Sequence, residues 1–288
     1  MERADYKELK KGGFMRQVQP DHFSMRLRIV GGQVKSEQLL AVYEISQKYG
    51  QGYVHMTSRQ GIEIPFIKLE DVDAVKQELA QSGLQTGACG ARVRTITACQ
   101  GNAICPSGLI DTTALAQEVD KKYYARDLPH KFKIGITGCR NNCLKAEEND
   151  LGVKGGLKPK WNETECIFCG LCEAVCPTKA ISINQDEQQL VYEESGCTYC
   201  GRCVKSCPTD AWEGQSGFIV YFGGLFGNRI TVGKQLLPII FSTEVLHQVI
   251  EATLAFFDKH GKPGERFANT LDRVGWSLLE RDLREVRQ

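Results

Sequence analysis

The chain has 288 residues, and its 36 basic and 35 acidic side chains leave a net charge of +1. This balance argues against nucleic-acid binding, which usually requires a basic excess. No run of about 18 apolar residues occurs, so we expect no membrane span. The charged N-terminal stretch lacks the apolar segment that a secretory signal contains, so we expect no such signal. At roughly 150 residues per domain, we expect about two domains in a protein of the reducing cytoplasm.

The first third of the chain alternates between strand and helix patterns. Strand character over 22–32 is followed by a helix over 36–50, by two strands over 52–59 and 61–67, and by a helix over 70–83. This βαββα order predicts an α+β layer of the ferredoxin-like type.

The helix over 36–50 has a predicted start and a predicted buried face. Ser36 is the expected N-cap, because its hydroxyl can accept a hydrogen bond from the first turn. The apolar stripe expected to face the sheet consists of Leu39, Leu40, Tyr43 and Tyr49.

The middle of the chain contains fewer regular patterns. We expect a strand over 91–96, a helix from Asp111 or Thr112 to about residue 128, and a buried strand over 132–138. Cys139 is expected to begin another helix, because the positive end of a helix dipole stabilises thiolates.

Strand character returns at 217–224, and an amphipathic helix is predicted over 243–261. These elements follow a cysteine-rich segment that is itself preceded by strands. We therefore expect the cysteine-rich segment to interrupt a single domain.

The chain contains 13 cysteines. In a reducing compartment, thiols at short spacings indicate metal binding. Eight of them form two C-x2-C-x2-C-x3-C-P runs, which are typical of bacterial ferredoxins with two 4Fe–4S clusters, and in this pattern the fourth cysteine of each run binds the other cluster. The two predicted ligand sets are therefore Cys166, Cys169, Cys172 and Cys207, and Cys197, Cys200, Cys203 and Cys176.

A pair of zinc knuckles is the alternative interpretation of these two runs. Zinc ribbons need neither four cysteines in each run nor the prolines that follow, Pro177 and Pro208. The pattern therefore favours iron–sulfur clusters.

A second group of cysteines comprises Cys99 and Cys105 in TACQGNAICPSG, and Cys139 and Cys143 in ITGCRNNCLKAE. The combination resembles the cluster motif of the sirohaem-dependent sulfite and nitrite reductases. In that family one cysteine sulfur bridges a 4Fe–4S cubane to the sirohaem iron, and by position Cys143 would be that thiolate. An isolated third cubane without haem is the alternative. Cys89 is left over and is expected to be a small, partly buried apolar residue.

The resemblance covers nearly the whole chain. It is closest to the small anaerobic and dissimilatory-type sulfite reductase subunits that carry a ferredoxin insert. It implies a ferredoxin-like half-domain over 1–83, a sirohaem and 4Fe–4S domain over 84–159 and 214–288, and an inserted two-cluster ferredoxin domain over 160–213. The implied cofactors are sirohaem and three 4Fe–4S clusters.

The resemblance also implies four anion-binding cations. Arg59 lies in MTSRQGIEI, which is similar to the family's Thr-x-Arg-Gln segment. Lys131 and Lys133 lie in LPHKFKIGI, which is similar to its Leu-Pro-x-Lys-Phe-Lys segment, and Arg94 precedes TITAC. These cations would hold the oxyanion and help relay protons for departing water. Ordinary surface cations are the alternative.

Polar residues beside these motifs are expected to contact the macrocycle or its carboxylates. They are Gln60, Thr97, Arg140, Asn141 and Asn142. The alternative is a structural role, because polar side chains beside a cluster often satisfy backbone groups.

The charges are distributed unevenly. Residues 91–140 contain eight basic and four acidic residues, whereas residues 161–217 contain nine acidic and three basic residues. A cationic bias near the first cysteines suits sirohaem, which is a polycarboxylate, and an anionic substrate.

The implied reaction is the six-electron reduction of sulfite to sulfide. Nitrite reduction to ammonia is a close variant, and a multi-cluster electron carrier without active haem is an alternative of another class. The chain has no convincing nucleotide-binding motif, so an external ferredoxin or flavoprotein is the expected electron donor. In larger, duplicated relatives the cations and the cluster come from different repeats. This chain has one repeat with both, so we expect a homodimer in which two chains complete each other's sites.

Overall fold

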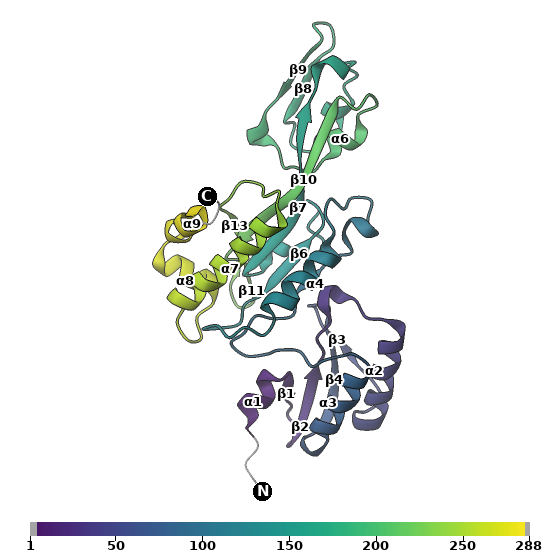
Figure 1. The fold of residues 1–288 in the computed structure, drawn as a ribbon, viewed down its shortest axis with the longest axis vertical. Coiled ribbons are helices and arrows are strands. Elements are labelled where there is room, and N and C mark those ends of the chain that lie inside the picture. Colours follow the sequence, from purple (N-terminus) through teal and green to yellow (C-terminus); the bar gives the residue numbers. More distant parts are fainter. Residues whose placement is uncertain (1–4, 286–288) are drawn as a thin grey trace.

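The computed structural model describes residues 5–285, which form two sheet-and-helix layers and a projecting cysteine-rich unit (Figure 1). The smaller sheet is antiparallel, with the strand order β1-β2-β4-β3. Its strands are β1 (Phe14–Arg16), β2 (His22–Arg26), β3 (His55–Met56) and β4 (Ile62–Lys68). The helices of this layer are α1 (Tyr6–Lys11), α2 (Ser36–Tyr49) and α3 (Val72–Gln81). The predicted α+β character of this region is confirmed, with one more helix and strand at the start.

Two details of α2 differ from the sequence prediction. The N-cap is Lys35, and Ser36 is the first helical residue. Most of the predicted stripe faces outward, since Leu39, Leu40 and Tyr43 are 47%, 58% and 58% exposed, whereas Tyr49 packs against the core as predicted. The other buried residues of the helix are Val42, Ile45 and Ser46. The helix packs on β4.

The larger sheet is mixed and has the strand order β13-β10-β7-β6-β5. Strands β5, β6 and β7 run parallel, and β10 and β13 continue the sheet in antiparallel fashion. The bounds are β5 (Thr97–Ala98), β6 (Ile134–Thr137), β7 (Leu151–Trp161), β10 (Trp212–Phe222) and β13 (Lys234–Gln235). A small hairpin of β11 (Leu225–Phe226) and β12 (Ile230–Thr231) follows β10.

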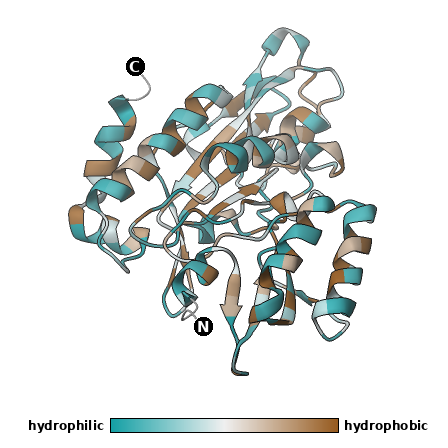
Figure 2. Ribbon diagram, turned by 60° about the horizontal axis from the view of Figure 1, so that its bottom comes forward, coloured by the Kyte–Doolittle hydropathy of each residue, from teal (hydrophilic) through white to brown (hydrophobic). Residues whose placement is uncertain are grey.

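Helices α4 (Thr112–Tyr123) and α7 (Thr243–His260) lie side by side over this sheet (Figure 1). Asp111 caps α4 and Ser242 caps α7 by accepting backbone hydrogen bonds. Helices α8 (Phe267–Val274) and α9 (Trp276–Glu285) complete the layer. The helices carry both apolar and polar residues (Figure 2), and buried apolar residues of β6, β7 and β10 pack against those of α4 and α7. This pattern fits a core between sheet and helices.

Two predicted elements are absent from the described chain. Residues 91–96 form only isolated bridges, at Arg92 and Val93, and the strand begins at Thr97. Residues 139–145 form turns instead of the helix expected at Cys139. Asn142 and Lys145 have φ angles of 54° and 56°, a left-handed conformation that an α-helix does not accommodate.

We call residues 162–211 the cysteine-rich unit. The chain leaves the sheet at Trp161 and returns at Trp212, and these two residues pair at the ends of β7 and β10. The unit contains α5 (Leu171–Ala174), the hairpin of β8 (Ile181–Asn184) and β9 (Gln189–Tyr192), and α6 (Arg202–Ser206). It projects from the end of the large sheet (Figure 1). Among residues 5–285, no helix is long and apolar enough to cross a membrane.

The small layer docks on the large one through buried polar contacts. Arg28 Nε donates to Asp120 Oδ2 at 2.8 Å, and the Arg28 guanidinium lies 3.9 Å from the centre of the Tyr124 ring. The N–H of Gly31 donates to the carbonyl of Ile96 at 2.9 Å. This docking holds the small layer against the N-terminal ends of β5 and β6.

Candidate active site and cluster sites

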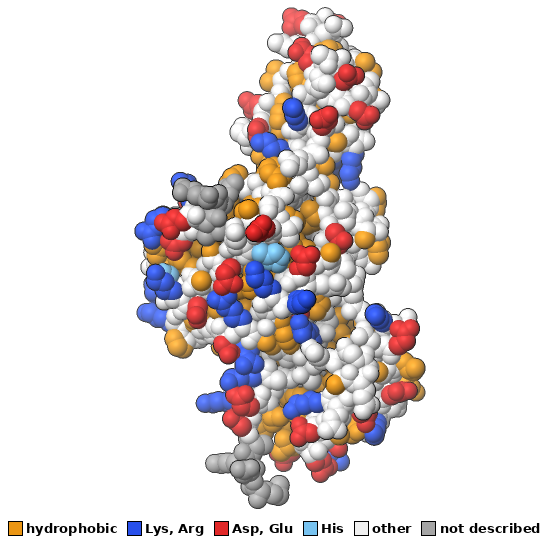
Figure 3. All heavy atoms as spheres, in the orientation of Figure 1, with side chains coloured by type: hydrophobic (Ala, Val, Ile, Leu, Met, Phe, Trp, Pro, Cys, Tyr) orange, Lys and Arg blue, Asp and Glu red, His pale blue; other side chains and the backbone are white. Residues whose placement is uncertain are grey.

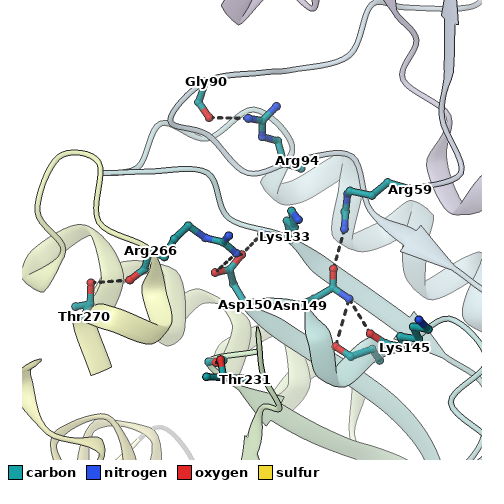
Figure 4. A network of polar contacts seen from close by, with 12 residues as sticks. Arg59, Gly90, Arg94, Lys133, Lys145, Asn149, Asp150, Thr231, Arg266 and Thr270 are labelled. Atoms are coloured by element: carbon teal, nitrogen blue, oxygen red, sulfur yellow. Dashed lines mark hydrogen bonds and ion pairs between the residues drawn. The ribbon is translucent and has the colours of Figure 1, made fainter. Parts of the chain in front are cut away.

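A cavity of about 450 Å³ lies between the two layers, and all four predicted cations line it. Arg59 comes from the turn before β4, Arg94 from the segment before β5, and Lys131 and Lys133 from the segment before β6. The structure therefore gathers on one cavity the cations that are far apart in the sequence (Figure 4).

Hydrogen bonds to protein acceptors hold the side chains of both arginines in place. Arg59 Nη1 donates to Asn149 Oδ1 at 2.7 Å, and Nη2 donates to the carbonyl of Thr95 at 3.2 Å. Burial lowers the pKa of Arg59 to about 10, against the opposing charge of Asp150. The guanidinium therefore remains charged at neutral pH.

Arg94 donates from Nη1 to the carbonyl of Ala88 at 2.9 Å and from Nη2 to that of Gly90 at 3.0 Å. Its Nε is buried and has no acceptor among residues 5–285. A buried donor without a partner is costly.

The two lysines are less basic than free lysine. Burial, together with the positive charges of Arg59 and Arg266, lowers the pKa of Lys133 to about 8. Burial also lowers the pKa of Lys131, together with the charges of Arg266 and Arg94. Lys133 is therefore poised to exchange a proton near neutral pH.

Arg266 and Asp150 belong to this site, and sequence reasoning missed both. Asp150 is fully buried and accepts a hydrogen bond at 2.9 Å from the backbone N–H of Lys133. Arg266, at the start of α8, pairs with Asp150 at 3.0 Å. No motif marks Arg266, and the 116 residues between the partners conceal the contact.

The residues expected to contact a macrocycle fall into two groups. The side-chain amide of Gln60 donates to the carbonyl of Ala98 at 2.8 Å and accepts a hydrogen bond from the N–H of Ala98 at 3.0 Å. Thr97 is buried, and its hydroxyl donates to the carbonyl of Ile134 at 3.4 Å. These two side chains are engaged inside the protein.

The second group lies beside the cysteines. Arg140 and Asn141 are exposed, and Arg140 Nη1 donates to the Tyr221 hydroxyl at 3.1 Å. Asn142 Oδ1 accepts the N–H of Ala146 at 2.8 Å. Arg140 and Asn141 are therefore available to a ligand, while Asn142 shapes the loop after Cys139.

Cys99, Cys105, Cys139 and Cys143, which we call the sheet set, lie together after the C-terminal ends of β5 and β6. The N–H of Gly138 donates to Cys99 Sγ at 3.0 Å. Burial raises the pKa of Cys139, and the charges of the other three thiolates raise it further. A Cβ on Gly138 would lie 2.9 Å from Gly101 Cα, so only glycine permits this close backbone approach. N–H···S contacts of this kind suit thiolates that bind a cluster.

The cysteines of the two ferredoxin-type runs also assemble, in the crossed arrangement that the sequence predicts. One small cavity is lined by Cys166, Cys169, Cys172 and Cys207, which we call the outer set. Another is lined by Cys176, Cys197, Cys200 and Cys203, which we call the inner set.

Backbone N–H groups point at sulfurs of both sets. The N–H of Phe168 lies 3.4 Å from Cys166 Sγ, and that of Ala180 lies 3.2 Å from Cys176 Sγ. Among residues 5–285, no three His, Cys, Asp or Glu side chains are placed to hold a single metal ion. A cubane offers a different iron to each thiolate, so its ligands stand farther apart than those of one ion. The cysteine sets therefore fit cubanes better than zinc.

The cations and the sheet set lie at opposite ends of the same strands. Thr95 and Lys133 line the cavity just before the parallel strands β5 and β6, whereas Cys99 and Cys139 follow the other ends of these strands. Within the part of the chain that the structure describes, no cysteine of the sheet set lines the cation cavity. One chain therefore does not bring both groups to one cavity.

Comparisons with known proteins identify the family of both layers. Residues 15–82 match the model of the nitrite/sulfite reductase ferredoxin-like half domain, and residues 89–287 match that of the nitrite and sulphite reductase 4Fe-4S domain. The coenzyme F420-dependent sulfite reductase of Methanocaldococcus jannaschii is 36% identical over 98% of this chain, which spans 44% of that protein's length. A subunit of the anaerobic sulfite reductase of Salmonella typhimurium is 34% identical, over 91% of this chain and 83% of that protein.

The fold is also found among solved structures. A dissimilatory sulfite reductase I superposes with a TM-score of 0.75 at 21% identity, over 91% of this chain and 69% of that one. Matches to both family models, together with relatives above 30% identity, account for almost the whole chain. The chain therefore belongs to the nitrite and sulfite reductase family.

Proposed function

We propose that this chain reduces sulfite to sulfide at a sirohaem coupled to a 4Fe–4S cluster. The observation that carries the proposal is the convergence of Arg59, Arg94, Lys131 and Lys133 on one cavity. Four cations around about 450 Å³ suit a small oxyanion and the carboxylates of a tetrapyrrole. Relatives named as sulfite reductases support sulfite as the substrate.

The proposed reaction consumes six electrons and seven protons to convert SO₃²⁻ into HS⁻ and three water molecules. When bound, the sirohaem–cluster pair supplies the redox chemistry, because no side chain stores electrons. Arg59 and Arg94 act as fixed charges that hold oxygen atoms of the anion. Lys133 donates a proton from Nζ to a departing oxygen, and its lowered pKa makes that donation efficient near neutral pH.

We further propose that all three cysteine sets hold 4Fe–4S clusters and that Cys143 bridges the sheet-set cluster to the haem. The outer and inner sets would make residues 160–213 a two-cluster ferredoxin domain inserted between 84–159 and 214–288. The crossed lining of the two small cavities supports this assignment.

We also propose that the working unit is a homodimer. The opposite placement of the cations and the sheet set supports it, because a haem on Cys143 of one chain would need cations from another chain. A two-fold axis supplies two such sites at once.

The test is anaerobic purification followed by measurement of iron, acid-labile sulfide and extractable tetrapyrrole. Three cubanes and one haem predict about thirteen irons per chain. Reduced methyl viologen then serves as the electron donor, with sulfite or nitrite as the acceptor. Stoichiometric sulfide from sulfite supports the proposal, and a strong preference for nitrite would make nitrite the substrate. About twelve irons without tetrapyrrole would indicate an electron carrier with three cubanes, and about eight irons would contradict three clusters.

A further inference from the structure

The inner set adjoins the loop that carries Cys105. Lys205 Nζ, on α6, donates to the carbonyl of Pro106 at 2.7 Å. A Cβ on Gly201, the residue after Cys200, would lie 3.2 Å from Leu157 Cβ and 3.6 Å from Leu109 Cδ2. The inner set therefore lies next to Leu157 of β7 and the 105–109 loop.

This loop in turn contacts the rest of the sheet set. The N–H of Leu109 donates to the carbonyl of Gly138 at 2.8 Å, and Gly138 also donates to Cys99 Sγ. A short path of bonded and packed atoms thus connects Cys200 to Cys99 and Cys139.

The outer set lies farther from the sheet. Its cavity is lined by residues of the cysteine-rich unit and by Trp212, at the far end of β10. The inner cavity, by contrast, is also lined by Pro159 of β7. The two sets are therefore in series, with the outer set at the tip of the unit.

The surface over the outer set has exposed apolar groups. Ile167 is 63% exposed and Leu171 is 46% exposed, and both line the cavity of the outer set. Cys169 is itself exposed. This arrangement leaves little protein between a cluster here and a partner's surface.

The tip carries acidic groups that are unpaired among the residues the structure describes, whereas Glu194 nearer the sheet is paired with Lys158 of β7 at 2.7 Å. Acidic groups dominate the upper part of the unit, and basic groups lie lower (Figure 3). Glu163, Glu165 and Glu173 are exposed beside the outer set. Arg202 and Lys205 instead flank Cys176 of the inner set. A positively charged partner is therefore steered to the tip.

We propose that the electron donor of this chain is a protein with a basic contact surface that docks on the tip formed by Ile167, Leu171 and the three glutamates. The outer, inner and sheet sets would hold the clusters that accept each electron from the donor's one-electron cofactor in this order, with the 105–109 loop beside the last transfer. The donor is oxidised by one electron as each cluster is reduced by one and reoxidised by the next. The inference rests on the proposed clusters, and it adds their order and the docking surface.

Cytochrome c, a basic one-electron protein, is the probe. We compare the cluster-loaded wild type with Glu163→Lys/Glu165→Lys/Glu173→Lys, and use Glu37→Lys/Glu44→Lys/Glu70→Lys as a control with the same change in net charge on the small layer. At low ionic strength the tip variant should bind cytochrome c at least about tenfold more weakly, and salt should abolish the difference. The control should stay within about twofold of the wild type. Equal weakening in both variants would overturn the proposal.

Carbodiimide cross-linking of the same complex followed by peptide mapping gives an independent readout. Cross-links should fall on Glu163, Glu165 or Glu173. Cross-links confined to acidic residues of the small layer would place the docking surface elsewhere. Iron content and electron paramagnetic resonance of the reduced variants verify that the clusters remain.

A second variant, Ile167→Ser/Leu171→Ser, tests the apolar part of the tip, with Leu40→Ser/Tyr43→Ser on α2 as the control. Electron transfer from dithionite-reduced protein to cytochrome c should slow several-fold only in the tip variant. Sulfite reduction with reduced methyl viologen as the donor distinguishes the proposed activity from the proposed docking surface. If this reduction fails while cytochrome c still binds the tip, the proposed activity is wrong and the docking surface stands. If it succeeds while the tip and control variants behave alike, only the docking surface is wrong.

Discussion

Arg266 Nη2 donates to both carboxylate oxygens of Asp150, each at 3.0 Å, and so joins the start of α8 to the start of β7. The Asp150 side chain is fully buried, and that of Arg266 is 12% exposed. Asp150 also accepts the backbone N–H of Lys133. The pair therefore fixes the backbone of a proposed catalytic lysine from below the cavity (Figure 4).

Removing one partner of this ion pair should be costly. Arg266→Met leaves a buried carboxylate without its cation, and we expect a loss of about 3 kcal/mol in the free energy of unfolding. Asp150→Asn/Arg266→Met should recover part of that loss, because the buried charge is gone. Anaerobic urea denaturation measures both variants.

The control for this prediction is Arg229→Met. Arg229 pairs with Asp272 at 2.9 Å, with the two side chains 57% and 43% exposed. Its loss should cost less than about 1 kcal/mol, because water screens exposed pairs. Similar losses for Arg266→Met and Arg229→Met would contradict a special role for Asp150.

The pKa of Lys133 predicts how activity depends on pH. Burial lowers this pKa from 10.5 to about 8, so the proton donor is lost as the pH rises through 8. We expect sulfite reduction to decline above about pH 8, unless bound sulfite raises the pKa by adding negative charge. Lys133→Arg should keep KM within a few-fold and lower kcat by about 100-fold, because arginine holds the anion but does not donate. The exposed Lys122→Arg should retain both constants.

The same shift affects stability in a defined direction. The unfolded chain binds the Lys133 proton up to about pH 10.5, whereas the folded chain releases it near pH 8. The unfolded state therefore holds more protons in this window, and stability contributed by this residue rises with pH across it. The free energy of unfolding of Lys133→Met relative to the wild type, measured from pH 7 to 10, should show the penalty shrinking. A constant difference would mean that Lys133 titrates normally.

The two ferredoxin-type cysteine sets were predictable from local spacing, whereas the sheet set and the four cations were implied by the resemblance of their flanking motifs to the family. The prediction of the outer set needed only the rule that the fourth cysteine of each run binds the other cluster. The structure brings its four members, Cys166, Cys169, Cys172 and Cys207, to one cavity. The half-domain could be predicted from its alternating strand and helix patterns, and a family model matches it.

The errors arose where tertiary contacts overrode local signals. Leu39, Leu40 and Tyr43 form a valid apolar stripe, yet α2 buries its other stripe because that one fits β4. The helix expected at Cys139 is replaced by turns, since Asn142 and Lys145 take left-handed conformations. Arg266 escaped notice because its partner is distant in sequence and its segment carries no motif. Such relationships exist only in three dimensions.

Cys143 is the proposed bridge between the haem and the sheet-set cluster. Cys143→Ser should uncouple the two centres and abolish multi-electron turnover, while the inner and outer clusters remain, because their cysteines lie in separate cavities. Electron paramagnetic resonance of the reduced variant measures the coupling directly. Cys89→Ser is the control, since Cys89 is buried beside Arg26 and away from the sheet set. If the coupling survives in Cys143→Ser, another cysteine of the sheet set is the bridge.

The placement of Lys133 before β6 and Cys139 after it predicts shared active sites. Residues before and after a strand lie at different ends of it, so we expect a haem held by one chain to meet the cations of another. Mixing Lys131→Ala/Lys133→Ala with Cys143→Ser by co-expression should therefore restore sulfite reduction. Each mixed dimer contains one site with intact cysteines and intact cations, and a random mixture should recover about a quarter of the wild-type rate, because half of the dimers are mixed and each has one working site of two. Each variant expressed alone is the control and should remain inactive. Sites contained within one chain would give no recovery at any ratio, and analytical ultracentrifugation of the wild type would then reveal whether the chain dimerises at all.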